Sequence, residues 1–219
     1  MLRQTRIVVA SPIRNNFVSQ VILQRREMKI YTKTGDKGTS GLFNGERRPK
    51  DDDVFEALGV CDELNSSVGI ALEHCELLGQ AEICIMLEEV SSRLFDVGSA
   101  IATPVNTTDS PSKLANTSFD EKNVDWLEKR IDEMDLELPQ LKNFILPSGG
   151  LAASQLHMAR TLARRAERRV WPLIRTNQVD PVVGRYLNRL SDFLFTVARV
   201  VCKRTGGVEK IYKKARVTS

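Results

Sequence analysis

The stretch LAASQLHMARTLARRAERRVWPLI, residues 151–174, decides the fold of this chain. Small and apolar side chains recur along it every three or four residues, which is the period of one face of an α-helix. These side chains belong to Ala152, Leu156, Ala159, Ala163, Ala166 and Val170. Because most of them are alanine, the axis of a second helix can come close to this face. The stretch therefore predicts a long helix packed against other helices.

The same period continues on both sides of this helix. It predicts helices over about 54–79, 81–101, 120–137 and 182–204. No segment alternates convincingly with a period of two, so we assign the chain to the all-α class. Five helices joined by mostly short connections make an up-and-down bundle, which we place in a single domain over residues 29–219. Residues 103–117 are rich in Thr, Ser, Asn and Pro and predict a mobile linker.

The net charge of +4 on these 219 residues is confined to one end of the chain. Residues 1–28 hold five arginines and a single acid, Glu27, whereas the rest of the chain balances 27 basic against 27 acidic side chains. A nucleic-acid-binding domain would be basic as a whole. The charge distribution therefore argues against that class for the body of the protein.

The segment 1–28 has the composition of a mitochondrial transit peptide, being rich in arginine and almost free of acids. We therefore expect a protein of the mitochondrial matrix. A disordered basic tail and an alternative start upstream of Met28 remain open as other interpretations. Because no apolar run approaches 18 residues, we expect no membrane-spanning helix.

Five arginines crowd into ten residues of the helix over 151–174, with one acid among them. Arg160, Arg164 and Arg168 are spaced by four and share a face beside the alanine face, whereas Arg165 and Arg169 are expected to point further outward. Arginines beside a core pair with carboxylates or bind an anion. An ordinary solvated basic face is the competing interpretation.

A second candidate for anion binding is the loop KIYTKTGDKGTSGLFNGERRPK over residues 29–50. Its glycines let backbone N–H groups converge on an anion, and its lysines, threonines and Ser40 add charge and hydroxyls. It lacks the GxxxxGK[ST] pattern of a Walker A loop. Such a loop together with an arginine-bearing helix indicates a polyphosphate ligand better than either feature alone.

Several other kinds of chemistry are disfavoured. No Glu-x-x-His pattern supports a diiron bundle, and the four cysteines form no CxxC pair. With two histidines in the chain, no nucleophilic triad can be argued. Asp62 lies near a core face and calls for a cationic partner. Asn188 and Asp192 lie one turn apart on the last helix, away from its apolar face.

Taken together and in this order, the motifs of the chain resemble the ATP:corrinoid adenosyltransferases of the propanediol-utilisation type. The resemblance covers nearly all of 29–214 and, with the leader, is strongest to the animal mitochondrial branch. It is carried by YTKTGDKGTSGLFNGERRPKDD (31–52), FEALGVCDELNS (55–66), LFDVGSAIATP (94–104), FILPSGG (144–150), RTLARRAERR (160–169) and YLNRLSDFLF (186–195). The family fold is a five-helix bundle with ferritin-like packing, assembled as a homotrimer.

The resemblance implies transfer of the 5′-deoxyadenosyl group of ATP to cob(I)alamin, which gives adenosylcobalamin and triphosphate. One subunit would contact ATP through Thr32, Lys33, Thr34, Gly35, Ser40 and Lys50. Its neighbour would contribute Arg164, Arg165, Ala166, Glu167, Arg168 and Asn188. Catalytic roles would fall to Arg164, Arg165, Glu167 and Asn188. Mg²⁺ would bind through ATP, with Glu167 as the one candidate protein ligand.

The implied corrinoid site consists of Asp62, Phe144, Arg160 and Asp192. Asp62 would pair with Arg160, and Phe144 would cover the lower face of the corrin ring, which favours reduction of cob(II)alamin. The implied partners are methylmalonyl-CoA mutase as recipient and a cobalamin reductant or trafficking protein. Alternative roles are delivery of adenosylcobalamin as a chaperone, a basic-helix nucleic-acid-binding module and a purely structural bundle.

Overall fold

The computed structural model describes residues 31 and 33–214 of the chain. The described residues before Lys37 belong to a unit of their own, and the helical domain begins at Lys37. The predicted transit peptide and its boundary at residue 28 lie outside the described residues. In the described part, no helix is long and apolar enough to cross a membrane.

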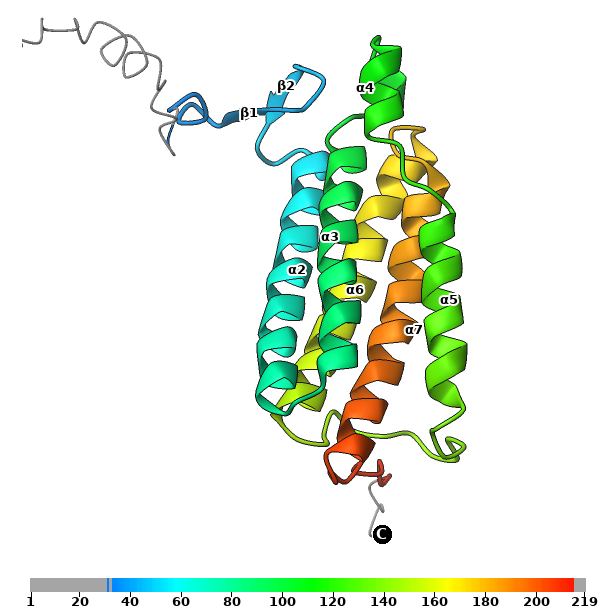
Figure 1. Cartoon of the computed structure of the whole chain (residues 1–219). Coiled ribbons are helices and arrows are strands. Elements are labelled where there is room, and N and C mark those ends of the chain that lie inside the picture. The colour runs from blue at the N-terminus through cyan, green and yellow to red at the C-terminus, as the bar shows by residue number, and fades with distance from the viewer. Residues whose placement is uncertain (1–30, 32, 215–219) are drawn as a thin grey trace, which may run out of the picture. The chain divides into compact units, whose positions relative to one another are not determined.

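Five long helices run alternately up and down along the chain (Figure 1). They are α2 (Asp53–Leu77), α3 (Ala81–Ile101), α5 (Lys122–Asp135), α6 (Leu151–Arg175) and α7 (Pro181–Arg204). Local chemistry sets where two of them begin, because the Asp52 and Asp180 carboxylates accept from backbone N–H groups of the first turn of α2 and of α7. The predicted five-helix bundle is confirmed.

The helices do not pack in chain order. Helix α6 packs against both α2 and α7, α3 packs on α2, and α5 packs on α7. As predicted, the alanine face of α6 is fully buried and lets its neighbours approach. Helices α5 and α7 run in the same direction and pack together. The connection from α5 to the start of α6 therefore crosses one end of the bundle (Figure 1). That connection carries Phe144.

The all-α class is confirmed, and the segment predicted as a glycine-rich loop contains a small hairpin. Strands β1 (Thr39–Gly41) and β2 (Arg47–Pro49) pair antiparallel, with Ser40 opposite Arg48. Three-residue strands are too short to show an alternating pattern in the sequence. The hairpin is attached to the bundle, since the Phe43 N–H donates to the Ala102 carbonyl at 3.0 Å.

The segment 103–117, which the composition predicts to be a mobile linker, contains two short helical elements. This segment forms a 3₁₀ turn, η2 (Val105–Thr107), and a short helix, α4 (Pro111–Asn116). The Val105 N–H donates to the Gln178 carbonyl at 2.8 Å, which ties the segment to the α6–α7 turn. Ser110 and Pro111 are linker residues by composition, but here they serve as the N-cap and first residue of α4.

The end of the bundle opposite the hairpin is closed by the C-terminal tail. Ile145 forms an antiparallel bridge with Ile211, and the Tyr212 N–H donates to the Phe144 carbonyl at 2.8 Å. The buried Arg199 guanidinium is paired with Glu209 at 2.9 Å. These contacts fix the backbone around Phe144, while its side chain stays 83% exposed.

Candidate active site

Two of the arginines of α6 are held by acids of α2. Arg165 forms an ion pair with Glu63, and Arg169 lies 3.9 Å from Glu56. Sequence reasoning missed both acids. Their spacing of seven places them on one face of α2, which could have been matched to two arginines one turn apart on α6.

Arg164 and Arg168, by contrast, are exposed and make no ion pair with any residue that the structure describes. The Arg168 guanidinium donates to the Arg164 carbonyl at 3.1 Å. The expectation that Arg165 points further outward is therefore wrong, because Arg165 is half-buried against α2. Arg164 and Arg168 are the exposed arginines at this level of α6 that have no acidic partner among the described residues.

Arg160, one turn before Arg164, is half-buried, and its Nε has no partner within the described part of the chain. Burial and the nearby Arg164 charge lower its pKa. Among the described residues no ion pair joins it to Asp62, since the acids of α2 that face α6 are Glu56 and Glu63. Within one chain, the predicted Asp62–Arg160 pair is thus not formed.

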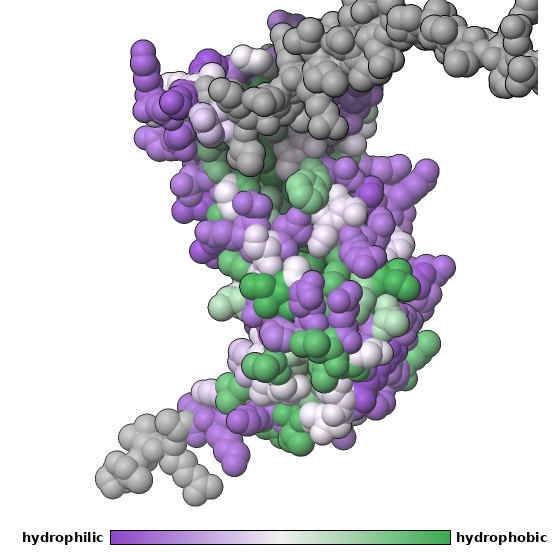
Figure 2. Space-filling view, turned by 60° about the vertical axis from the view of Figure 1, so that its left-hand side comes forward, coloured by the Kyte–Doolittle hydropathy of each residue, from purple (hydrophilic) through white to green (hydrophobic). Residues whose placement is uncertain are grey.

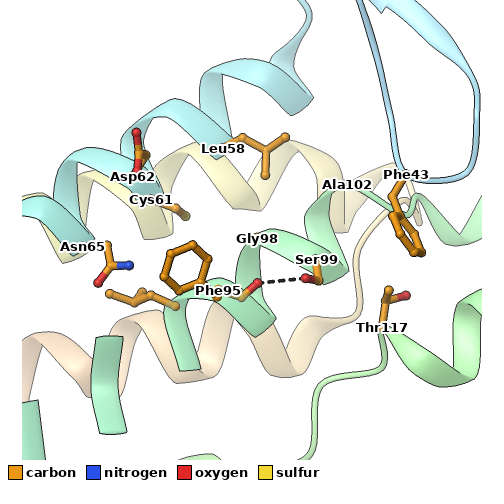
Figure 3. Close-up of a pocket in the computed structure, with 11 residues that line it drawn as sticks. Phe43, Leu58, Cys61, Asp62, Asn65, Phe95, Gly98, Ser99, Ala102 and Thr117 are labelled. Atoms are coloured by element: carbon orange, nitrogen blue, oxygen red, sulfur yellow. Dashed lines mark hydrogen bonds between the residues drawn. The ribbon is translucent and has the colours of Figure 1, made fainter. Parts of the chain in front are cut away.

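Asp62 instead borders a cavity of about 330 Å³ between α2 and α3 (Figure 3). The walls are mainly apolar, and the polar groups of Asp62 and Asn65 both come from α2. The Phe95 ring lies beside Asn65 and Cys61, and Phe43 of the hairpin closes the far end. The volume is at the lower limit for a drug-sized ligand, so this cavity alone does not enclose a corrinoid.

A second cavity of about 330 Å³, the α5–α7 groove, brings Glu167 and Asn188 together. The Asn188 Nδ2 donates to Glu167 Oε1 at 3.1 Å. The groove is lined by Glu121, Val124, Asp125, Glu128, Glu167, Trp171, Gly184, Arg185, Asn188 and Arg189. Asp192, one turn beyond Asn188, accepts from Arg189 at 2.6 Å, and Arg189 also donates to Glu128 of α5 at 2.9 Å.

The predicted ATP residues of the loop fall into two groups. Ser40 lies in β1, and the backbone N–H of the exposed Lys50 donates to the Gly38 carbonyl at 3.0 Å. Lys33, Thr34 and Gly35 belong to the unit before Lys37, and Thr32 lies outside the described residues.

Arg48 connects the hairpin to the turn between α6 and α7. It donates to Glu46 at 2.8 Å and to Gln178 of the α6–α7 turn at 2.7 Å. The hydrogen bond from Arg48 is the main reason that the pKa of the Glu46 carboxyl falls from 4.5 to about 2. The charged form of Glu46 therefore stabilises the hairpin.

We expect Glu46→Gln to lower the free energy of unfolding at pH 7. Because the folded-state pKa lies below the unfolded one, this stabilisation is present above pH 4.5 and is lost as the pH falls towards 2. The difference between wild type and variant should shrink over that interval in urea unfolding measured at a series of pH values. A constant difference at every pH would contradict the role of the Glu46 charge.

The family of this chain follows from its similarity to known proteins. A model of the family described as cobalamin adenosyltransferase matches residues 30–201. The chain belongs to this family. The corrinoid adenosyltransferase MMAB of Mus musculus is 52% identical over 186 residues, which cover 85% of this chain and 78% of the mouse protein. The Bacillus subtilis corrinoid adenosyltransferase is 44% identical over 193 residues, covering 87% of this chain and 95% of that protein.

The fold agrees with a solved structure of the same family. A variant of the PduO-type ATP:corrinoid adenosyltransferase from Lactobacillus reuteri, complexed with cobalamin and ATP, superimposes with a TM-score of 0.76 at 36% identity. The match covers 85% of this chain and 100% of the other. The enzyme class predicted from the sequence is thereby confirmed: the chain is a corrinoid adenosyltransferase, an enzyme that makes adenosylcobalamin from ATP and a corrinoid.

The adenosyltransferase does not gather its predicted corrinoid residues into one cavity of a single chain. Asp62 borders the cavity between α2 and α3, and Asp192 lies beside Arg189 near α5. Phe144 lies in the connection between α5 and α6, shortly before α6 begins at Leu151. The cavity that Asp62 borders is therefore not lined by Phe144, Arg160 or Asp192.

The Glu167 carboxylate of the adenosyltransferase fits a role beside Mg²⁺. Its Oε1 is occupied by Asn188, whereas Oε2 makes no hydrogen bond to another residue that the structure describes. Within the described residues, no three His, Cys, Asp or Glu side chains are grouped as metal ligands. A single carboxylate suits Mg²⁺, which in nucleotide sites takes one or two carboxylates and completes its shell with phosphates and water.

Proposed function

We propose that this adenosyltransferase transfers the 5′-deoxyadenosyl group of ATP to cob(I)alamin, with Arg164 and Arg168 on the triphosphate. The supporting observation is that some arginines of α6 have acidic partners on α2 and others do not. Arg165 and Arg169 are held by Glu63 and Glu56, which leaves Arg164 and Arg168 as exposed cations next to Glu167. Guanidinium groups bind phosphate oxygens through paired, charge-assisted hydrogen bonds.

The proposed chemistry requires no acid or base from the protein. The cobalt of cob(I)alamin is the nucleophile, the bond from C5′ to the triphosphate oxygen breaks, and negative charge grows on the leaving group. Arg164 and Arg168 would stabilise that charge. A bound Mg²⁺, held by the triphosphate and Glu167, would neutralise part of the same charge.

We further propose that the active site forms between copies of the chain in a homotrimer. Hydrophobic side chains gather on the exposed face over α2 and α3 (Figure 2), and Ile70, Ile85 and Phe95 are each at least half exposed. Exposed apolar patches of this kind mark interaction surfaces. A second copy covering this face would also lie beside the cavity that Asp62 borders, because Phe95 lines that cavity.

Phe144 is proposed as the apolar cover of the lower corrin face. Its ring is exposed, whereas its backbone is bonded to Tyr212 and its neighbour Ile145 is bridged to Ile211. A side chain presented in this way can displace a lower axial ligand and exclude water. The same end exposes Leu146, Leu151 and Ile211, which suits the handover of adenosylcobalamin to another protein.

The setting that we propose is the mitochondrial matrix, with methylmalonyl-CoA mutase as recipient and a reductant or trafficking protein as supplier of the corrinoid. The composition of residues 1–28 and the similarity to the mammalian MMAB proteins support it. A nucleic-acid-binding role is disfavoured, because two of the five clustered arginines are already paired with acids of α2.

The direct test is anaerobic incubation of the protein with ATP, Mg²⁺ and cob(I)alamin. We expect the absorption spectrum of adenosylcobalamin to appear with stoichiometric triphosphate. Light scattering of the same sample should give the mass of three chains. A folded protein that leaves the cob(I)alamin spectrum unchanged would contradict the proposed reaction, and a monomer with full activity would contradict the shared site.

A further inference from the structure

Trp171 is a residue of the α5–α7 groove that none of the motifs singles out. It lies one turn after Glu167 on α6 and is 40% exposed. Its indole N–H is directed at Glu167 Oε1, with the two heavy atoms 3.5 Å apart. The same oxygen accepts from Asn188 Nδ2 at 3.1 Å, so two neutral donors from α6 and α7 share one carboxylate oxygen.

Gly184 of α7 leaves room beside this tryptophan. A Cβ atom at Gly184 would come within 2.7 Å of Ile174 Cδ1 and 3.9 Å of two atoms of the Trp171 ring. A glycine inside a helix costs about 1 kcal/mol relative to alanine, so its position is best explained by close packing. The close approach of α7 at Gly184 is to Ile174, and the Trp171 ring lies next to it at ordinary van der Waals distance.

Glu167 accepts from neutral donors although three arginines lie close to it in the sequence. Arg164, Arg165 and Arg168 lie within three positions of Glu167, yet the ion pairs of the described residues include none between them and Glu167. An arginine across the carboxylate would occupy both oxygens and cancel its charge. Trp171 and Asn188 orient the group through Oε1 alone, which leaves its charge intact and Oε2 available to a ligand.

We propose that Trp171 is a positioning residue that fixes Glu167 for the divalent cation carried by ATP. The inference rests on the proposed function, because it takes the ligand of Glu167 to be the cation that accompanies the polyphosphate. Trp171 itself need not touch the nucleotide. Its contribution should therefore depend on the presence of both Glu167 and the metal ion.

The test measures nucleotide binding by calorimetry, without a corrinoid, for Trp171→Phe and Trp171→Leu. Phenylalanine keeps a ring against Gly184 and removes only the donor, whereas leucine removes both. We expect both variants to weaken the binding of ATP in Mg²⁺ roughly three- to tenfold, which is the range for loss of one hydrogen bond. With ATP and excess EDTA, the same variants should differ from wild type by less than about twofold.

A double-mutant cycle separates this role from a purely structural one. Because Trp171 is proposed to act through Glu167, Trp171→Phe should cause no further loss of affinity in the Glu167→Gln background. Trp126→Phe is the matched control, since Trp126 packs on Phe193 at 5.9 Å and does not line the groove. This control should bind ATP in Mg²⁺ as wild type does.

Three results would overturn the role of Trp171: wild-type affinity in Trp171→Phe, equal losses with and without Mg²⁺, or additive losses in the double mutant. Each of these leaves the proposed function standing, because wild type still binds ATP in Mg²⁺. A wild-type protein that binds no ATP would contradict the proposed function itself. Thermal unfolding of every variant, followed by circular dichroism, checks that losses of affinity come from folded protein.

Discussion

Replacing Arg164 with alanine is expected to reduce kcat/KM for ATP-dependent adenosylation by about a hundredfold or more. Arg164 is exposed, carries no ion pair within the described residues and lies on the same helix as Glu167. Removing one preorganised donor from a developing negative charge typically costs this much. Formation of adenosylcobalamin from pre-reduced cob(I)alamin, followed by absorbance over a range of ATP concentrations, gives the measurement.

The matched control is Arg175→Ala, which removes the same charge from the exposed last turn of α6. It should leave kcat/KM within about twofold of wild type, because a distant exposed charge is screened by salt. Arg168→Ala should resemble Arg164→Ala. Full activity in both Arg164→Ala and Arg168→Ala, with the assembly intact, would remove the triphosphate assignment.

The second large effect is expected from Phe144→Ala, and it should depend on the oxidation state of the corrinoid. Starting from cob(II)alamin with a reductant, we expect a loss of about ten- to a hundredfold, which corresponds to the burial energy of a phenylalanine side chain. Starting from pre-reduced cob(I)alamin, the loss should be much smaller, since that species needs no displacement of a lower ligand.

The contrast between these two assays carries the assignment of Phe144. Leu136→Ala is a suitable control, because Leu136 is an exposed apolar residue at the start of the same connection. It should match wild type in both assays. Equal losses of Phe144→Ala on the two corrinoid states would show that Phe144 contributes to general binding and not to reduction.

The long helices of this protein can be predicted from its sequence because each buries one face. The alanine face of α6, from Ala152 to Val170, predicts both the helix and its close neighbours, and it is buried as expected. The hairpin and the helix α4 cannot be predicted in this way. They are short and held by contacts with distant residues: Arg48 of the hairpin donates to Gln178, and Lys113 of α4 donates to the Asn44 carbonyl.

For the candidate site, too, some features follow from the sequence and others only from the tertiary structure. The sequence by itself determined the enzyme family and the residue types of a polyphosphate site, because motif order and charge spacing are properties of the chain. Only the tertiary structure decided that Glu63 holds Arg165, that Arg164 remains exposed and that Asn188 of α7 reaches Glu167. Those outcomes depend on how α6 is rotated against α2 and α7, and helix periodicity specifies a face without specifying what packs against it.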